Sequence, residues 1–136
     1  MLRSVLLLVA VMFVSSVSAN EIRLRAYTTS YTWYDNTPPG SSAIAYSKSD
    51  GFPTLHTEAG GSGTYVDPIT IAVGHVITKG ESKPDFPPGT IFYIPNVRRY
   101  FVVEDVCGDG QKPQNGPCHK LDSEARAAGA TVWLDM

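Results

Sequence analysis

Residues 99–110 read Arg-Tyr-Phe-Val-Val-Glu-Asp-Val-Cys-Gly-Asp-Gly, an apolar strand pattern that leads into two carboxylates, a cysteine and a glycine-rich turn. In one strand the side chains alternate between faces, so Phe101, Val103 and Asp105 share one side. Glu104 then ends the other side, and each acid has apolar neighbours. Partial burial favours the neutral form that a general acid needs. The alternative is an Asp105 that only accepts backbone hydrogen bonds in the following turn.

The two cysteines, Cys107 and Cys118, enclose a loop made almost wholly of turn-forming residues. In an oxidising compartment such a pair is expected to form a disulfide. Closing this loop would stabilise the fold by about 3 kcal/mol. A metal site completed by His119 or His75 is the competing interpretation, but the paired Cys-x-x-Cys spacing of such sites is missing. We predict the disulfide, no metal and no cofactor, and we expect the isolated histidines, His56 included, to be structural or solvated.

The first 19 residues have the pattern of a secretory signal peptide. Arg3 supplies the positive charge, residues 5–14 form the apolar segment, and Val17-Ser18-Ala19 has the small residues of a cleavage site. The apolar segment is shorter than the roughly 20 residues needed to span a bilayer. We therefore expect a secreted, extracellular protein without membrane attachment after cleavage. Its mature chain, residues 20–136, is expected to be a single domain.

The charge distribution argues against a nucleic-acid-binding protein. The chain has 11 basic and 13 acidic residues, for a net charge of −2. The basic residues are scattered, with Arg98 and Arg99 as the one adjacent pair. Nucleic-acid binders carry a clustered positive surface instead.

The rest of the mature chain is typical of short strands separated by Gly- and Pro-rich loops, as in a small barrel. The clearest strands are residues 90–94 and 100–106, which a turn joins into a hairpin. A helix is expected at 121–128, capped by Asp122 or Ser123 and followed by Gly129. A long strand or a bent pair of strands is expected at 22–35. Further strands are expected at 43–46, 66–73 and 131–136, with loops at 36–42, 47–52, 58–63 and 78–88.

The expected strand at 22–35 places its odd-numbered residues on one face. Tyr27, Tyr31 and Trp33 would then form an aromatic row with Asp35, suited to stacking on the apolar faces of sugar rings. A bulge near residues 28–29 would instead put these aromatic side chains into the core. Both interpretations stay open from the sequence alone.

Five segments, taken together and in their order along the chain, carry a resemblance to a known superfamily. They are Ala26-Tyr-Thr-Thr29 with Tyr31-Thr-Trp-Tyr34, Ile69-Thr-Ile-Ala-Val-Gly74, Pro87-Pro-Gly-Thr-Ile-Phe-Tyr-Ile94, Tyr100-Phe-Val-Val-Glu-Asp105 and Trp133-Leu-Asp135. In this order they resemble the double-psi β-barrel superfamily, which includes rare lipoprotein A, the three-aspartate domain of membrane-bound lytic transglycosylase A, expansins and family 45 glycoside hydrolases. The likeness is closest to small secreted fungal members and covers about residues 26–136.

The resemblance implies an all-β fold, a small six-stranded double-psi β-barrel with long Gly/Pro loops and at most one short helix. Because the chain stops at Met136, we expect the last strand of the barrel to be missing. The resemblance also implies that Asp135 is a catalytic acid, with Asp105 as its near partner and Asp35 as a loose analogue of a base. Gly74 stands where the three-aspartate pattern has its first aspartate. The candidate sugar-binding residues are Tyr27, Tyr31, Trp33 and Trp133.

We therefore expect a secreted monomer that binds cell-wall polysaccharide through an aspartate-lined groove. If it is catalytic, the resemblance implies a glycoside hydrolase or a lytic transglycosylase. If it is not, it implies a loosening factor, and the fold alone does not decide between them. The alternative is a secreted protease inhibitor or effector that binds a protein partner through its loops, since some double-psi barrels inhibit cysteine proteases.

Overall fold

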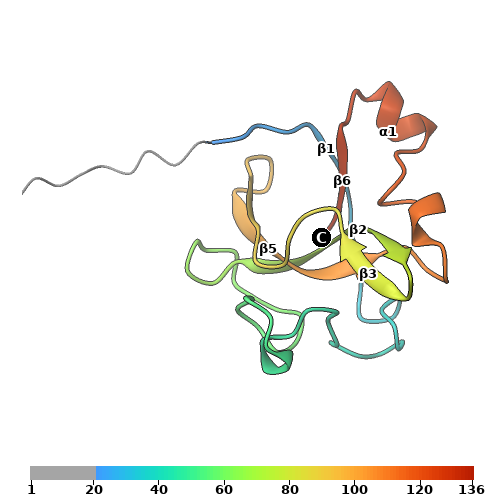
Figure 1. Cartoon of the computed structure of the whole chain (residues 1–136). Coiled ribbons are helices and arrows are strands. Elements are labelled where there is room, and N and C mark those ends of the chain that lie inside the picture. Colours follow the sequence, from blue (N-terminus) through green and yellow to red (C-terminus); the bar gives the residue numbers. More distant parts are fainter. Residues whose placement is uncertain (1–20) are drawn as a thin grey trace, which may run out of the picture.

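The computed structural model describes residues 21–136, which fold into six β-strands and one short α-helix (Figure 1). The expected signal peptide lies outside the described residues. The all-β, six-stranded, barrel-like fold with a single short helix is confirmed. The elements are β1 Ala26–Thr29, β2 Ile69–Thr78, β3 Glu81–Pro84, β4 Ile91–Ile94, β5 Arg99–Cys107, α1 Ser123–Ala127 and β6 Val132–Asp135, with 3-10 turns at Lys48–Asp50 and Pro113–Asn115.

The strands form a curled half-barrel sheet in the order β1–β6–β2–β5–β4, and β3 pairs with β2 (Figure 1). Two of the pairs, β1 with β6 and β2 with β5, are parallel, and the others are antiparallel. Parallel pairs need long crossover connections. β3 and β4 lie in the connection from β2 to β5, and the connection from β1 to β6 contains all the other elements.

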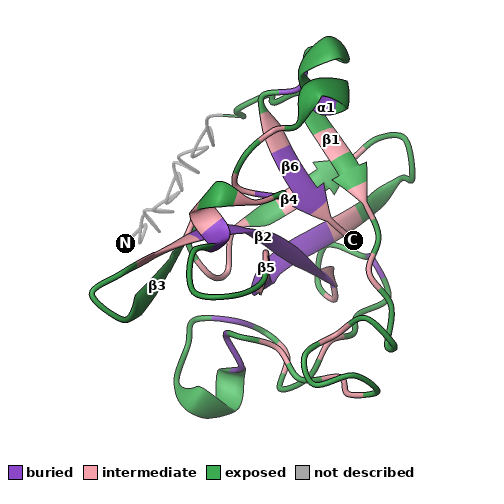
Figure 2. Ribbon diagram, turned by 90° about the vertical axis from the view of Figure 1, so that its right-hand side faces the viewer, coloured by how far each residue is buried: buried purple, intermediate pink, exposed green. Residues whose placement is uncertain are grey.

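The two central strands, β2 and β5, are buried along most of their length (Figure 2). Strands covered on both faces have near-continuous apolar sequences rather than alternating ones. Ile71 pairs with Val103 and Ala72 with Asp105, so Glu104 is an extra residue in the ladder, a β-bulge. The core cluster consists of Ile71, Val73, Phe101, Val103 and Leu134.

Two expected elements form as predicted. The strands β4 and β5 pair as an antiparallel hairpin. Helix α1 begins after Asp122, whose carboxylate accepts a hydrogen bond from the Ala125 N–H at 2.8 Å. Gly129 follows the helix with φ of 71°, a left-handed conformation that glycine adopts without steric cost.

The long strand or bent pair of strands expected at 22–35 is wrong, because the one strand in this range is β1, which ends at Thr29. A turn follows, in which the Thr32 hydroxyl donates to the Asp35 carboxylate at 2.8 Å and the Gly40 N–H donates to the Trp33 carbonyl at 2.8 Å. Because these turn contacts fix the backbone of residues 32–40, the side chains there no longer alternate as they would in a strand. The aromatic row that depended on that strand therefore does not form.

Two further segments differ from expectation. Residues 43–46 are not a strand but cross the end of β5, where the Tyr46 N–H donates to the Glu104 carbonyl at 2.9 Å. The expected loop at 78–88 contains β3, because Lys79 and Gly80 have φ of 54° and 82° and form a tight hairpin turn. A Lys-Gly turn lacks the Asn-Gly signal from which such a hairpin is usually predicted.

Among residues 21–136, no helix is long and apolar enough to cross a membrane.

Candidate functional site

An open groove with a volume of about 470 Å³ lies at the carboxyl end of β5. Four of the predicted catalytic and sugar-binding residues contribute to its lining, namely Asp35, Asp105, Asp135 and Tyr31. The structure thus brings together the three aspartates that the sequence separates by up to 100 residues.

The floor of the groove is set by the strand register around Ala72. Ala72 on β2 pairs with Asp105 on one side and with Asp135 on the other. Residues directly opposite each other in a ladder point to the same face, so both carboxyls flank the Ala72 methyl group. Two strand spacings separate the backbones of the aspartates by about 10 Å. The small side chain between them leaves the groove open.

Asp105 is largely buried and is held by three donors. The backbone N–H groups of Ala45 and Val106 donate to Oδ1 at 3.0 and 2.9 Å, and the Tyr31 hydroxyl donates to Oδ2 at 3.3 Å. Burial raises the pKa of Asp105, these hydrogen bonds oppose the rise, and the charge of Asp135 adds to it. Burial and the neighbouring Asp105 also raise the pKa of Tyr31, so its hydroxyl remains a proton donor.

Asp135 is oriented by a chain of two hydrogen bonds. The Trp133 Nε1–H donates to Thr29 Oγ1 at 2.8 Å, and the Thr29 hydroxyl donates to Asp135 Oδ1 at 2.7 Å. Burial raises the pKa of Asp135, the bond from Thr29 opposes the rise, and the negative charge of Asp35 adds to it. Both central carboxyls of the groove therefore hold a proton more readily than ordinary aspartates do.

The disulfide between Cys107 and Cys118 is confirmed. Its two sulfur atoms lie within 4.8 Å of a carboxylate oxygen of Asp135. Because the sulfurs are bonded to each other, they do not offer the thiolates that bind a metal ion. The bridge instead lies beside Asp135 and holds the start of the loop between its two cysteines at the groove.

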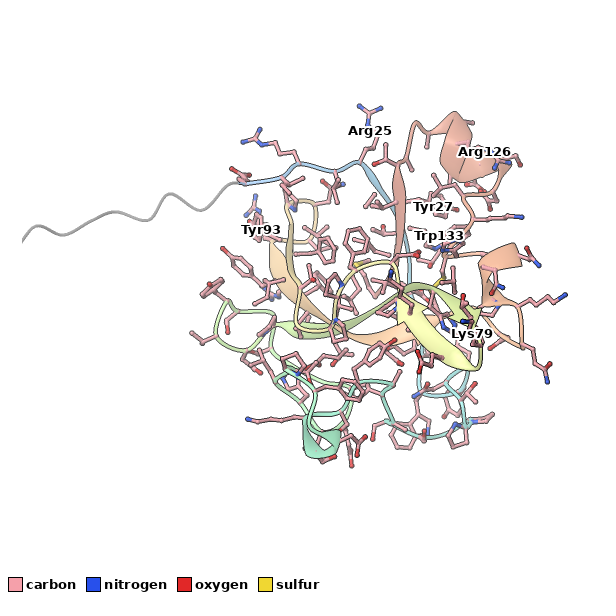
Figure 3. All side chains as sticks on the ribbon, viewed as in Figure 1. Arg25, Tyr27, Lys79, Tyr93, Arg126 and Trp133 are labelled. Atoms are coloured by element: carbon pink, nitrogen blue, oxygen red, sulfur yellow. A yellow bond between two sulfur atoms is a disulfide. The ribbon has the colours of Figure 1, made fainter. Side chains whose placement is uncertain are left out.

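The remaining predicted residues have different surroundings. Tyr27 and Trp133 pack edge to face with ring centroids 4.9 Å apart, so they cover each other (Figure 3). Trp33 is 56% exposed and, with Tyr31, lines a second depression of about 320 Å³. Hydrogen bonds from the Thr32 side chain and backbone lower the pKa of Asp35, so it is the ionised aspartate at the rim.

Gly74 has a structural reason to lack a side chain. A Cβ at this position would collide with the Asp85 carboxylate and with the backbone of His119. Asp85 and His119 are themselves joined by a hydrogen bond of 2.7 Å between Oδ1 and Nδ1. This packing leaves no room for an aspartate side chain at position 74.

A second carboxylate cluster surrounds Glu104, the bulged residue next to Asp105, and was missed in the sequence. Glu104 is fully buried and accepts four hydrogen bonds, two from the N–H groups of Leu55 and His56, one from His56 Nδ1 and one from the Thr70 hydroxyl. His56 Nε2 also lies 3.2 Å from Asp67 Oδ1. The isolated positions of these residues along the chain gave no signal, because only the fold brings them together.

This cluster is ionised by its own geometry. Burial alone would raise the pKa of Glu104, but the bonds from Thr70, His56 and Leu55 outweigh it and lower the pKa. Burial likewise opposes the charge of His56, and the hydrogen bonds to Glu104 and Asp67 raise its pKa overall. Both ring nitrogens of His56 thus face carboxylates, and the four hydrogen bonds to Glu104 all come from protein groups.

The chain is similar to a known protein over most of its length. It is 36% identical over 121 residues to uncharacterized protein DDB_G0273701/DDB_G0273221 of Dictyostelium discoideum. The alignment covers 88% of this chain and 46% of the relative, so the chain spans about half of that protein. No solved structure matches the chain. A family model, the DDB_G0273701 N-terminal domain, matches residues 23–125, a span that includes Asp105 and ends before Asp135. The chain belongs to the family of the DDB_G0273701 N-terminal domain.

Proposed function

We propose that the protein is a secreted, double-psi-type barrel that binds a cell-wall polysaccharide in the groove and acts on its glycosidic bonds. The observation that carries this proposal is the pair formed by Asp105 and Asp135, which flank Ala72 in one open groove. The disulfide supports secretion, since such bonds persist in oxidising compartments.

The hydrogen bonds support a division of roles between the two aspartates. Asp105 accepts three bonds, two of them from backbone N–H groups that can only donate, and these bonds oppose the rise in its pKa that burial causes. The Thr29 hydroxyl occupies Oδ1 of Asp135 and leaves Oδ2 for a proton. Asp135 is therefore the proton donor of the proposal, and Asp105 is the carboxylate that stays charged.

The chemistry follows from this pair. Asp135 protonates the glycosidic oxygen while positive charge develops on the sugar ring, and Asp105 stabilises that charge or activates water. Inverting glycosidases place their two carboxyls about 6.5–9.5 Å apart to leave room for the water. Tyr31 and the exposed Trp33, in the adjoining depression, offer aromatic faces to neighbouring sugar rings.

The test is binding and turnover on chitin, cellulose, β-glucan and peptidoglycan. We expect Asp135→Asn to lower turnover at least about 100-fold while binding persists, because a general acid contributes about 10²–10⁴-fold. Asp50→Asn, in an exposed 3-10 turn, is the matched control and should leave turnover unchanged. Polysaccharide binding without released sugar would identify a binding or loosening protein. Absence of binding to all four polymers would contradict the proposal.

The alternative function is inhibition of a secreted protease by the loops. It is favoured by large side chains exposed on loops, with Tyr34 84% and Val66 85% exposed. Loops on a rigid β-scaffold are a common way to present a binding surface. Nanomolar inhibition of papain, combined with failure on all four polysaccharides, would support this alternative.

A further inference from the structure

A serine and a buried histidine meet on the hairpin of β2 and β3, whose turn is marked by Lys79 in Figure 3. Ser82 pairs with Ile77, so His75, two residues earlier on β2, is its diagonal neighbour on the same face. Ser82 Oγ lies 2.7 Å from His75 Nδ1. Ser82 is exposed to solvent, whereas His75 is only 6% exposed.

The Gly108 carbonyl oxygen can only accept a hydrogen bond, and this fixes the direction of the other hydrogen bonds around His75. The Gly108 carbonyl oxygen lies 3.2 Å from His75 Nε2, so the neutral ring carries its proton on Nε2. Nδ1 then has a free lone pair and accepts the proton of the Ser82 hydroxyl. The Tyr46 hydroxyl, 3.5 Å from Ser82 Oγ, is left as a donor to that oxygen.

We propose that Ser82 is a nucleophile, with His75 as its general base, and that this pair, which adjoins the aspartate-lined groove, hydrolyses carboxylic esters. Hydroxyl, imidazole and acceptor stand in the order of a serine–histidine triad, with the Gly108 carbonyl in place of the usual carboxylate. Asp105 and Asp135 take no part in this hydrogen-bonded chain. His75 and Gly108 also line the groove that holds these two aspartates, so the two sites adjoin. The ester reaction uses neither aspartate, so its failure would leave the proposed polysaccharide function untouched.

The reaction uses water as its only co-reactant. Ser82 Oγ bonds to the ester carbonyl carbon while its proton passes to Nδ1 of His75. The bond from that carbon to the alcohol oxygen then breaks, and Nδ1 gives its proton to the departing alcohol. Water attacks the acyl-serine, loses a proton to Nδ1 and releases the carboxylic acid, and the proton returns to Ser82. Burial raises the pKa of Tyr46, so its hydroxyl stays protonated and can donate to the oxyanion.

The test uses the full chain with p-nitrophenyl acetate and with a fluorophosphonate that labels activated serines. We expect a one-to-one phosphonate adduct on Ser82, located by mass spectrometry, and saturable release of p-nitrophenol. Ser82→Ala should abolish both signals. Ser62→Ala is the matched control and should change neither, because the Ser62 hydroxyl faces the carbonyl of Asp67 rather than an imidazole.

Two further variants separate the roles of the neighbours. Tyr46→Phe should lower the release of p-nitrophenol by roughly 100-fold if its hydroxyl binds the oxyanion. His75→Gln should abolish labelling, and if this buried substitution prevents folding, Ser82→Ala still provides the test because its side chain is exposed. Folded protein that gives no adduct on Ser82, or that labels Ser62 and Ser82 equally, would overturn the proposal.

Discussion

Glu104 and Asp105 are consecutive in the sequence, yet the fold uses them in opposite ways. Glu104 is completely buried, and its carboxylate accepts four hydrogen bonds from loop and strand groups. Asp105 is 7% exposed, is held by three donors and lines an open groove. The β-bulge at Glu104 separates the two, because one extra residue changes which neighbours each side chain meets.

The difference shows how burial alone misleads in the search for a site. Both carboxylates lose water, and burial favours the neutral acid in each case. In Glu104 the protein supplies enough donors to reverse the shift and lower the pKa. In Asp105 the donors do not suffice, and the pKa is raised. A carboxyl that the protein leaves incompletely satisfied beside a groove is the one available to a ligand.

The largest effect is expected for Glu104→Gln. A glutamine amide has one accepting oxygen where the Glu104 carboxylate has two. His56 and the other donors to Glu104 therefore lose a buried, charged acceptor. We expect the free energy of unfolding to fall by about 3–5 kcal/mol in urea denaturation. Glu58→Gln is the matched control, because Glu58 is exposed and accepts a single bond from Ser42, and it should cost less than about 1 kcal/mol. Equal losses in the two variants would remove the basis for calling Glu104 structural.

A smaller effect, with a signature in pH, is expected for His56→Gln. The folded-state pKa of His56 is raised, so its stabilising contribution is complete below the unfolded value of about 6.5 and is lost as pH rises through the folded pKa. Because hydrogen bonds to charged groups are lost, we expect the free energy of unfolding of His56→Gln to fall by about 2 kcal/mol at pH 6. The wild-type melting temperature should therefore decline from pH 6 towards alkaline pH.

The variant pair decides whether His56 causes this decline. His56→Gln should flatten the profile, whereas His119→Gln, which removes a more exposed partner of Asp85, should preserve it. A profile that keeps its slope in His56→Gln would show that another group titrates there.

The smallest effect is expected for Asp105→Asn. The raised pKa means that the stabilising contribution of the protonated Asp105 is present below the unfolded value of about 3.9 and is lost as pH rises through the folded pKa. The neutral amide avoids the cost of a buried charge at pH 7 and keeps an acceptor for the N–H groups of Ala45 and Val106. We expect the free energy of unfolding, measured in urea, to rise by at most about 1 kcal/mol. A loss as large as that of Glu104→Gln would mean that Asp105 is structural as well.

Much of the fold was predictable because local patterns encode it. Alternating and apolar runs placed β5 and its hairpin partner β4, and the Asp122 and Gly129 signals placed α1. The long strand at 22–35 failed because local turn contacts at Thr32 overrode a favourable strand composition. β3 was missed because its Lys-Gly turn carries a weak signal.

The candidate site was predictable only in part. Asp105, Asp135 and Asp35 were identified, and the structure places all three on one groove. The aromatic row, one of the two interpretations left open, does not form because β1 ends at Thr29, and of its aromatic members only Tyr31 lines that groove. The Glu104 cluster and the Ser82–His75 pair were not foreseen, because their members are unremarkable until distant strands and loops meet.

The sequence by itself determined the strand-rich class, the disulfide between its two cysteines and the acids at the end of β5, because composition, spacing and periodicity are local properties. Only the tertiary structure decided which acid is satisfied and which faces the groove. That outcome depends on the bulge in β5, on the register that sets Asp105 and Asp135 beside Ala72, and on the loop that brings His56 to Glu104. The protonation of a carboxyl follows from the donors and charges around it, and the fold assembles these from parts of the chain that are far apart in sequence.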